Sequence, residues 1–194
     1  MMSKRIGIFG GSFNPIHVGH AIIASSIMRQ GLVDQLWFMV TPENPFKQGQ
    51  QLAPEHHRLR MTELVSRRIA GAVTSSFEMQ LPRPSYTIDT LNALQEKFPT
   101  FEFSLIIGAD NWAKWQQWKS PEKIIRYHHV FIYPRLGYEV VIPDDIKNHV
   151  TLINAPIIEV SSTEIRQLIA EEKSASFYLT DTVEAYILKN NLYR

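Results

Sequence analysis

The apolar and polar residues of this chain follow two periods, one typical of buried strands and the other of amphipathic helices. Ile6–Phe9 is a short apolar run between glycines, which predicts a buried strand, and residues 21–30 carry apolar side chains at helical spacing. The same criteria predict strands at 36–40, 72–77, 101–107, 129–133 and 157–160, and helices at 54–69, 88–97 and 180–192, with shorter ones from 120 and 161. Strands that alternate with helices indicate a parallel sheet with crossover helices.

The pattern therefore predicts an α/β fold with a doubly wound parallel sheet and a C-terminal helical portion. With 194 residues, the chain is long enough for one sizeable core and too short for two large domains. We expect a single domain that spans residues 1–194, with a surface excursion at the weakly patterned residues 134–148. Open parallel sheets bind ligands beyond the carboxyl ends of their strands, so the residues that follow strands are the first candidates for a site.

The stretch after the first strand, residues 10–20, reads G-G-S-F-N-P-I-H-V-G-H. Gly10 and Gly11 permit backbone angles that side chains forbid, and Asn14-Pro15 indicates a turn, so this loop can bring its amides close to a ligand. The helix after the loop offers unpaired N–H groups and the positive end of its dipole. Both favour a phosphate.

Two histidines stand where this helix opens. His17 and His20 are three residues apart on one face of the first turn, and Gly19 between them leaves room for a bulky anion. A lone histidine here is more often a surface residue or a cap, and a glycine pair alone is often only a turn. The joint pattern is hard to justify by folding alone, and it is neither a P-loop nor the dinucleotide G-x-G-x-x-G motif.

A second candidate lies near the C-terminus, where S-S-T-E-I-R opens the helix predicted from residue 161. Ser161 and Glu164 have capping-box spacing, so the simplest interpretation is a well-capped helix with a solvated arginine. Arg166 is nevertheless suited to phosphate, because a guanidinium fork matches phosphate oxygens better than an ammonium does.

Composition excludes several classes of protein. A formal net charge of +1 argues against a protein built mainly to bind nucleic acid. The chain has no cysteine, so structural disulfides and thiolate metal sites are excluded, and no cluster of carboxylates or histidines suggests a permanent metal site. Without a long apolar segment, neither a signal peptide nor a membrane span is expected. These features predict a soluble cytoplasmic protein and leave its oligomeric state open, a homo-oligomer included.

Both motifs resemble those of the nucleotidyltransferases related to class I aminoacyl-tRNA synthetases, which move a nucleotide monophosphate from a triphosphate to a phosphate acceptor. The resemblance implies a Rossmann-like sheet and a catalytic role for His17, His20 and Arg166, the arginine holding the leaving pyrophosphate. It further implies that ATP is bound by the first motif, by a lysine after the second predicted strand and by the second motif. The residues are Gly10, Gly11, Ser12, Phe13, Asn14, Gly19, Lys47, Ser162 and Thr163.

Over nearly the whole chain, the sequence is most similar to the bacterial nicotinate mononucleotide adenylyltransferases. P-S-Y-T at 84–87 resembles a family segment whose threonine contacts the nicotinate carboxylate, and G-A-D at 108–110 resembles one whose aspartate holds ribose hydroxyls. Trp118 has the spacing of the tryptophan that stacks on the pyridine ring, with Trp115 as the alternative, although clustered tryptophans also pack in cores. The resemblance implies that nicotinate mononucleotide contacts Asn44, Tyr86, Thr87, Asp110 and Trp118.

One departure from the family lies after the second predicted strand. The family has a loop that ends P-P-H-K, whereas this chain reads T-P-E-N-P-F-K, with Phe46 in place of the histidine. Lys47 can still act as a point charge on the phosphates, and Asn44 can donate to one of them. Asn14 in place of the more common aspartate is a milder change, because it removes a negative charge beside a polyphosphate.

The resemblance implies that the 5′-phosphate of nicotinate mononucleotide attacks the α-phosphorus of ATP, with magnesium accompanying the triphosphate. The alternatives are an adenylyltransferase for nicotinamide mononucleotide or pantetheine phosphate, and a nucleotide-binding sensor without turnover. A nicotinamide mononucleotide adenylyltransferase would differ at the ring-carboxylate contacts of Thr87. A pantetheine phosphate adenylyltransferase is usually shorter and lacks P-S-Y-T. The intact His17, His20 and Arg166 argue against a sensor.

Overall fold

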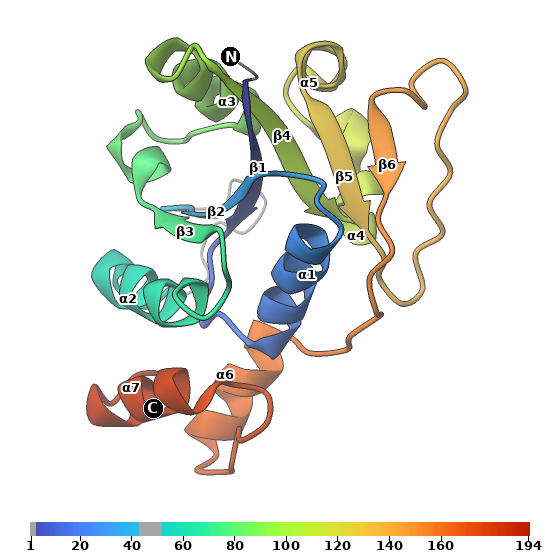
Figure 1. Cartoon of the computed structure of the whole chain (residues 1–194). Coiled ribbons are helices and arrows are strands. Elements are labelled where there is room, and N and C mark those ends of the chain that lie inside the picture. Colours follow the sequence, from blue (N-terminus) through green and yellow to red (C-terminus); the bar gives the residue numbers. More distant parts are fainter. Residues whose placement is uncertain (1–2, 43–51) are drawn as a thin grey trace.

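The computed structural model of the chain describes residues 3–42 and 52–194 (Figure 1). Within them, six parallel strands form one sheet in the order β3-β2-β1-β4-β5-β6. The strands are β1 (Lys4–Gly11), β2 (Gln35–Val40), β3 (Ala72–Ser75), β4 (Phe101–Gly108), β5 (His129–Tyr133) and β6 (Val150–Leu152). The helices are α1 (Val18–Arg29), α2 (Glu55–Ser66), α3 (Thr87–Lys97), α4 (Ala109–Trp112), α5 (Pro121–Tyr127), α6 (Ser162–Ala170) and α7 (Asp181–Lys189), with the 3₁₀ turns η2 (Phe77–Gln80) and η3 (Trp115–Gln117). The predicted doubly wound, Rossmann-like fold is confirmed.

The strand order places a switch point between β1 and β4. From β1 the chain moves outward to β2 and β3, and it then returns to the other side of β1 with β4. Phe9 of β1 pairs with Phe38 of β2 on one side and with Ile106 of β4 on the other. The loops that leave the carboxyl ends of β1 and β4 therefore run to opposite sides, and such a crevice is where open α/β sheets bind ligands.

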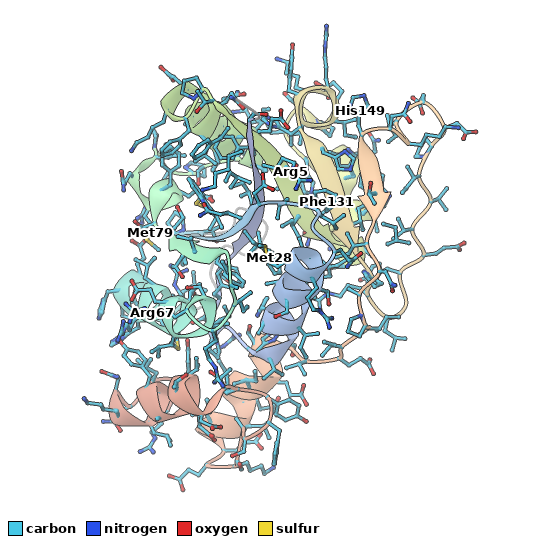
Figure 2. The ribbon with its side chains drawn as sticks, in the orientation of Figure 1. Arg5, Met28, Arg67, Met79, Phe131 and His149 are labelled. Atoms are coloured by element: carbon cyan, nitrogen blue, oxygen red, sulfur yellow. The ribbon has the colours of Figure 1, made fainter. Side chains whose placement is uncertain are left out.

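Two apolar cores cover the two faces of the sheet. Successive side chains of β5 point to opposite faces of the sheet. Phe131 and Tyr133 belong to the core under α1, α2, α6 and α7. Val130 and Ile132 belong to the core under α3, α4 and α5. Figure 2 labels Phe131 and also Met28 of α1, which packs against the first core. Because helices bury both faces, the strands read as continuous apolar runs.

The C-terminal helical portion lies against the first face. In Figure 1, α6 and α7, in orange and red, lie together below α1 and α2. His57 of α2 and Tyr186 of α7 are joined by a hydrogen bond of 2.8 Å between Nδ1 and the phenolic oxygen. The C-terminal helices thus extend the core instead of forming a body of their own.

The structure corrects two of the predicted strands. Residues 157–160 form no strand; β6 instead takes Val150–Leu152, where Val150 pairs with Val130 and is buried. The later segment follows Pro156, which has no N–H to donate to a sheet, and Ile157 is 53% exposed. The strand predicted at 72–77 ends at Ser75, and η2 follows it. Residues 134–148, the predicted surface excursion, are exposed or half-buried.

Candidate active site

The two histidines of the first motif lie together at the opening of α1. His17 is the N-cap residue, with an extended φ of −140°, and its backbone N–H donates to Nδ1 of His20 over 3.3 Å. The ring centroids are 3.8 Å apart and the planes are tilted by 34°. Sequence spacing alone predicted that the two imidazoles share one face, and the fold places them in contact.

His17 is buried, with 4% of its surface exposed. Burial, together with the nearby cation of Arg135, lowers the pKa of His17 from 6.5 to about 3. The ring is therefore neutral at pH 7 and offers an N–H donor, not a full positive charge. A polyphosphate that binds beside it would raise this pKa.

Two residues of the loop have a structural role that the sequence did not predict. A side chain at Gly19 would place its Cβ 3.0 Å from the His17 ring, so glycine at this position leaves room for the imidazole. Phe13 has a φ of 45° and is 2% exposed, and its ring packs edge-on against His20 with centroids 5.1 Å apart. Only the backbone of Phe13 is therefore left for a nucleotide.

The second motif opens α6 directly against this loop. Ser161 caps the helix as predicted, because its hydroxyl accepts from the backbone N–H of Glu164 over 3.1 Å. The Ser162 hydroxyl donates to the carbonyl of Pro15 over 2.9 Å, across 147 residues of sequence. The fold thus brings the two predicted phosphate motifs together.

Arg166 completes this contact between the motifs. Its Nη1 donates to the carbonyl of Asn14 over 2.8 Å, and its Nη2 donates to the Thr163 hydroxyl over 3.3 Å. A guanidinium has five N–H donors in a planar fork, so these two bonds leave others for a ligand. The Asn14 side-chain oxygen accepts from the Tyr193 hydroxyl over 2.9 Å and from the backbone N–H of Ala53 over 3.0 Å.

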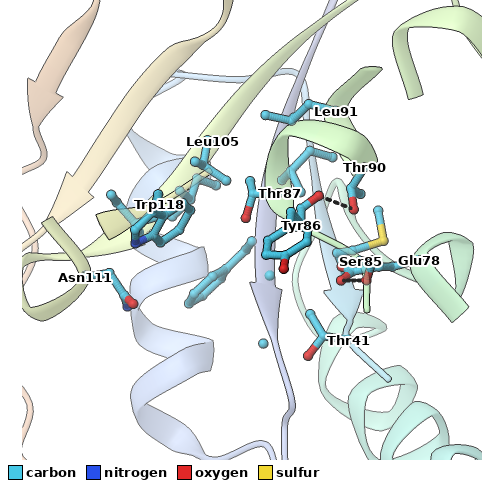
Figure 3. Close-up of a pocket in the computed structure, with 18 of the residues that line it drawn as sticks. Thr41, Glu78, Ser85, Tyr86, Thr87, Thr90, Leu91, Leu105, Asn111 and Trp118 are labelled. Carbon is cyan, nitrogen blue, oxygen red and sulfur yellow. Dashed lines mark hydrogen bonds between the residues drawn. The ribbon is translucent and has the colours of Figure 1, made fainter. Parts of the chain in front are cut away.

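A cavity of about 370 Å³ opens at the switch point, where Gly10 and Gly11 of β1 lie beside the end of β4. Tyr86, Thr87 and Trp118, all predicted contacts of the pyridine nucleotide, line this cavity. Figure 3 shows the Trp118 ring on one side, with Tyr86 and Thr87 on the other.

Trp115 does not line this cavity. It is 4% exposed and belongs to the core under α3 and α5. The sequence left Trp115 and Trp118 as alternatives, and the geometry favours Trp118 as the tryptophan that meets a ligand.

Asp110 lies at the edge of the cavity and not in its lining, whereas its neighbours Gly108 and Asn111 line it. Its carboxylate Oδ1 is 3.6 Å from Nε of Arg135, and a Cβ at Gly108 would collide with that same oxygen. Glycine at 108 therefore leaves room for the carboxylate. Arg135, which follows β5 and also faces His17, was not singled out from the sequence.

The cavity also contains a buried carboxyl group that the sequence did not single out. The Ser85 hydroxyl donates to Oε1 of Glu78 over 2.7 Å, and both residues line the cavity (Figure 3). Burial raises the pKa of Glu78, although the bond from Ser85 opposes the shift. Ser85 belongs to P-S-Y-T, so the motif was a signal for the serine, but Glu78 lies just beyond the strand predicted at 72–77, in no predicted element.

Arg58 is a third residue that the sequence did not single out. Its guanidinium is buried beside the glycine loop, where it contacts only carbonyl oxygens within the described residues. The signal was present, because Arg58 stands three residues before Met61 and seven before Val65 on the buried stripe of α2.

The remaining predictions concern residues outside the described ranges, metals and membranes. Asn44 and Lys47 lie outside the described residues. In residues 3–42 and 52–194, no group of three or more His, Cys, Asp or Glu side chains could hold a metal ion. Nor does any helix in those ranges have the length and apolar character needed to cross a bilayer.

A parallel sheet with a glycine loop, an imidazole pair and an arginine-bearing helix at its carboxyl edge defines the class of α/β nucleotidyltransferases. The sequence model of the cytidylyltransferase-like family matches residues 8–168. The chain is 43% identical over 183 residues to the probable nicotinate-nucleotide adenylyltransferase of Bacteroides thetaiotaomicron, covering 94% of this chain and 90% of the relative. It is 42% identical over 195 residues to that of Christiangramia forsetii, covering 100% of both. The chain belongs to the cytidylyltransferase-like family and, within it, to the nicotinate-nucleotide adenylyltransferases.

Solved structures have the same fold. The nicotinic acid mononucleotide adenylyltransferase of Plasmodium falciparum, solved with NaAD and with APC, superimposes with a TM-score of 0.80 at 23% identity, covering 98% of this chain and 97% of that chain. A putative nicotinate-nucleotide adenylyltransferase from Vibrio parahaemolyticus superimposes with a TM-score of 0.72 at 25% identity, covering 98% and 96%. The resemblance inferred from the motifs is thereby confirmed at the level of family and fold.

Proposed function

We propose that this chain transfers the adenylyl group of ATP to nicotinate mononucleotide, forming nicotinate adenine dinucleotide and pyrophosphate in NAD biosynthesis. One observation carries the proposal: the glycine loop of the first motif and the P-S-Y-T segment line one cavity at the switch point. An ATP phosphate on the loop and a pyridine ring against Trp118 would then meet within one site. The sequence relatives, which are named for the same activity, support it.

The chemistry requires little of the protein beyond positioning and charge neutralisation. A 5′-phosphate oxygen of the acceptor forms a bond to the α-phosphorus, and the bond from that phosphorus to the bridging oxygen of the β-phosphate breaks. Its electron pair leaves with pyrophosphate. Because the nucleophile is already an anion, no strong general base is needed, and fixed donors around the transferred group supply the stabilisation.

The residues of the two motifs fit these roles. The neutral ring of His17 and the adjacent ring of His20 would donate hydrogen bonds to the charge that develops on the transferred group. Arg166, with donors left over from its bonds to Asn14 and Thr163, would hold the pyrophosphate. The opening of α6 at Ser162 would add its N–H groups and hydroxyl, as helix N-termini do for anions.

The acceptor would occupy the cavity itself. Thr87 and Tyr86, at the opening of α3, would face the ring and its carboxylate, and Trp118 would stack on the ring. Asp110 would accept from ribose hydroxyls. Lys47 and Asn44 stay as proposed contacts of the phosphates. Magnesium would accompany ATP, with phosphate oxygens and water as its ligands. A cytoplasmic location fits the use of soluble nucleotide substrates.

Pyrophosphate release tests the proposal directly. The protein is incubated with ATP and magnesium, and side by side with nicotinate mononucleotide, nicotinamide mononucleotide or pantetheine phosphate. We expect a large preference for the nicotinate compound and a loss of most turnover in His20→Ala, with unchanged circular dichroism. A preference for either other acceptor would assign the chain to that reaction, and ATP binding with no release for any acceptor would favour a sensor.

A further inference from the structure

A buried arginine stands beside the glycine loop and, in the part of the chain that the structure describes, donates no hydrogen bond to a carboxylate. Arg58 of α2 is 1% exposed, and its hydrogen bonds within the described residues all go to backbone carbonyls. Nε donates to Ala53 over 3.0 Å, Nη1 to Ser12 over 2.8 Å and to Thr41 over 2.6 Å, and Nη2 to Pro42 over 3.1 Å. Burial lowers the pKa of Arg58, but a guanidinium remains a cation in proteins.

Such an arrangement is costly for folding alone. Removing a guanidinium from water carries a large desolvation penalty, and only partial charges on carbonyl oxygens offset it here. The closest acidic side chain on the same helix, Glu55, is paired with Arg83 over 2.7 Å. Within residues 3–42 and 52–194, no carboxylate is hydrogen-bonded to Arg58, and its charge lies next to the loop that is proposed to bind the triphosphate.

The carbonyls that Arg58 holds belong to three separate stretches of the site. Ser12 continues the glycine loop, Thr41 lines the cavity at the end of β2, and Ala53 precedes α2. The Ala53 backbone N–H donates in turn to the Asn14 side chain over 3.0 Å. One side chain thus ties the first motif to the two ends of the segment that carries Lys47.

Holding the Ser12 carbonyl has a consequence for the opposite side of that peptide. In a planar trans peptide the C=O and N–H groups point in opposite directions. A side chain that bonds the carbonyl of Ser12 therefore turns the N–H of Phe13 away from itself, and Ser162 does the same for the N–H of Ile16 by bonding Pro15. An anion site needs N–H groups toward the ligand and carbonyls away from it.

We propose that Arg58 is a positioning residue of the ATP site. By holding the carbonyl of Ser12, it turns the N–H of Phe13 toward the polyphosphate. By holding the carbonyls of Thr41 and Pro42, it ties the end of β2 to the loop, and its own positive charge lies behind the loop. The inference rests on the proposed use of ATP at this site. It predicts that loss of Arg58 weakens ATP binding selectively, because Tyr86, Thr87 and Trp118 do not contact it.

The test uses Arg58→Lys and Arg58→Gln in the full chain. Lysine keeps the charge but, as a point donor on a flexible stem, it cannot reproduce the fork, whereas glutamine loses both. Arg60 gives a matched control on the same helix: it is half exposed and pairs with Glu63 over 2.8 Å, so Arg60→Lys and Arg60→Gln should change nothing. Calorimetry measures binding of magnesium and a non-hydrolysable ATP analogue, and kinetics measure KM for both substrates.

We expect both Arg58 variants to weaken analogue binding at least tenfold and to raise KM for ATP equally, with KM for nicotinate mononucleotide within twofold of wild type. Thermal unfolding confirms that folded proteins are compared, and millimolar methylguanidinium should partly restore ATP binding to Arg58→Gln. Unchanged ATP binding in Arg58→Lys would overturn the inference. So would an equal loss for both substrates, or a lysine variant that does not fold, since Arg58 would then serve the fold as a whole.

Failure of the proposed function would look different. The calorimetric comparison uses magnesium and the non-hydrolysable ATP analogue, so it needs no acceptor and no turnover. A wild-type protein that binds the analogue but releases no pyrophosphate with nicotinate mononucleotide would refute the reaction and leave the role of Arg58 open to the same measurement.

Discussion

His17 should make the stability of the folded protein depend on pH below neutrality. The ring is 4% exposed, and burial with the nearby Arg135 cation holds its pKa at about 3, against 6.5 for an ordinary histidine. Between these two values the unfolded chain binds a proton at His17 and the folded chain does not. The stability linked to this residue is therefore fully present above pH 6.5 and is lost as the pH falls toward 3.

The size of the effect follows from this difference in proton binding. A group that is protonated only in the unfolded state changes the free energy of unfolding by about 1.4 kcal/mol per pH unit. Between pH 7.0 and pH 5.0 the slope begins shallow, because the unfolded histidine is only partly protonated near its own pKa. The loss attributable to His17 over this interval integrates to about 2 kcal/mol.

Urea unfolding at pH 7.0 and pH 5.0 measures this loss when the wild type is compared with His17→Asn, which cannot titrate. The comparison is needed because burial also lowers the pKa of His57, His128 and His129, so the wild type should lose additional stability of the same sign. We expect the loss between the two pH values to be about 2 kcal/mol smaller in the variant.

Equal losses in the two proteins would refute the argument, since His17 would then bind its proton equally well in the folded and unfolded states. A change in the dependence on urea concentration would mean instead that the variant had altered the folded or unfolded ensemble. The two m-values must therefore agree before the free energies are compared.

Four further substitutions test other parts of the site and the core. Trp118→Ala should raise KM for nicotinate mononucleotide by roughly ten- to hundredfold, as kinetics would show, at little cost in stability. Trp115→Ala, in the core, should lower the free energy of unfolding by about 3–5 kcal/mol, as urea unfolding would show. Ser85→Ala removes the donor to the buried Glu78 and should cost about 1–3 kcal/mol at pH 7. Since protonation relieves the unpaired carboxylate, that cost should shrink as the pH falls, and a constant cost would contradict the assignment. Leu94→Ala should cost about 2–5 kcal/mol by urea unfolding and leave KM for both substrates unchanged; altered KM values would show that this core reaches the site.

Local pattern predicted most of the elements and both motifs. Apolar runs marked five of the strands, because strands buried on both faces need side chains of one kind throughout. Ser161 was recognised as a cap because its bond to Glu164 spans only three residues. His17 and His20 were expected on one face for the same reason, since helical geometry alone relates positions i and i+3.

Tertiary structure decided what depends on partners far away in the sequence. Residues 157–160 have the composition of a strand, but β5 pairs with Val150–Leu152, and which segment pairs depends on where the chain returns to the sheet edge. Trp115 and Trp118 are only three positions apart in the sequence. In the fold, Trp115 is buried in the core whereas Trp118 lines the cavity. Likewise, the composition of α2 does not tell why Arg58 is buried; its partners are carbonyls up to 46 residues away. Residue spacing determines local geometry, whereas the burial and the charge of side chains at the site come from contacts that form only when the strands and helices assemble.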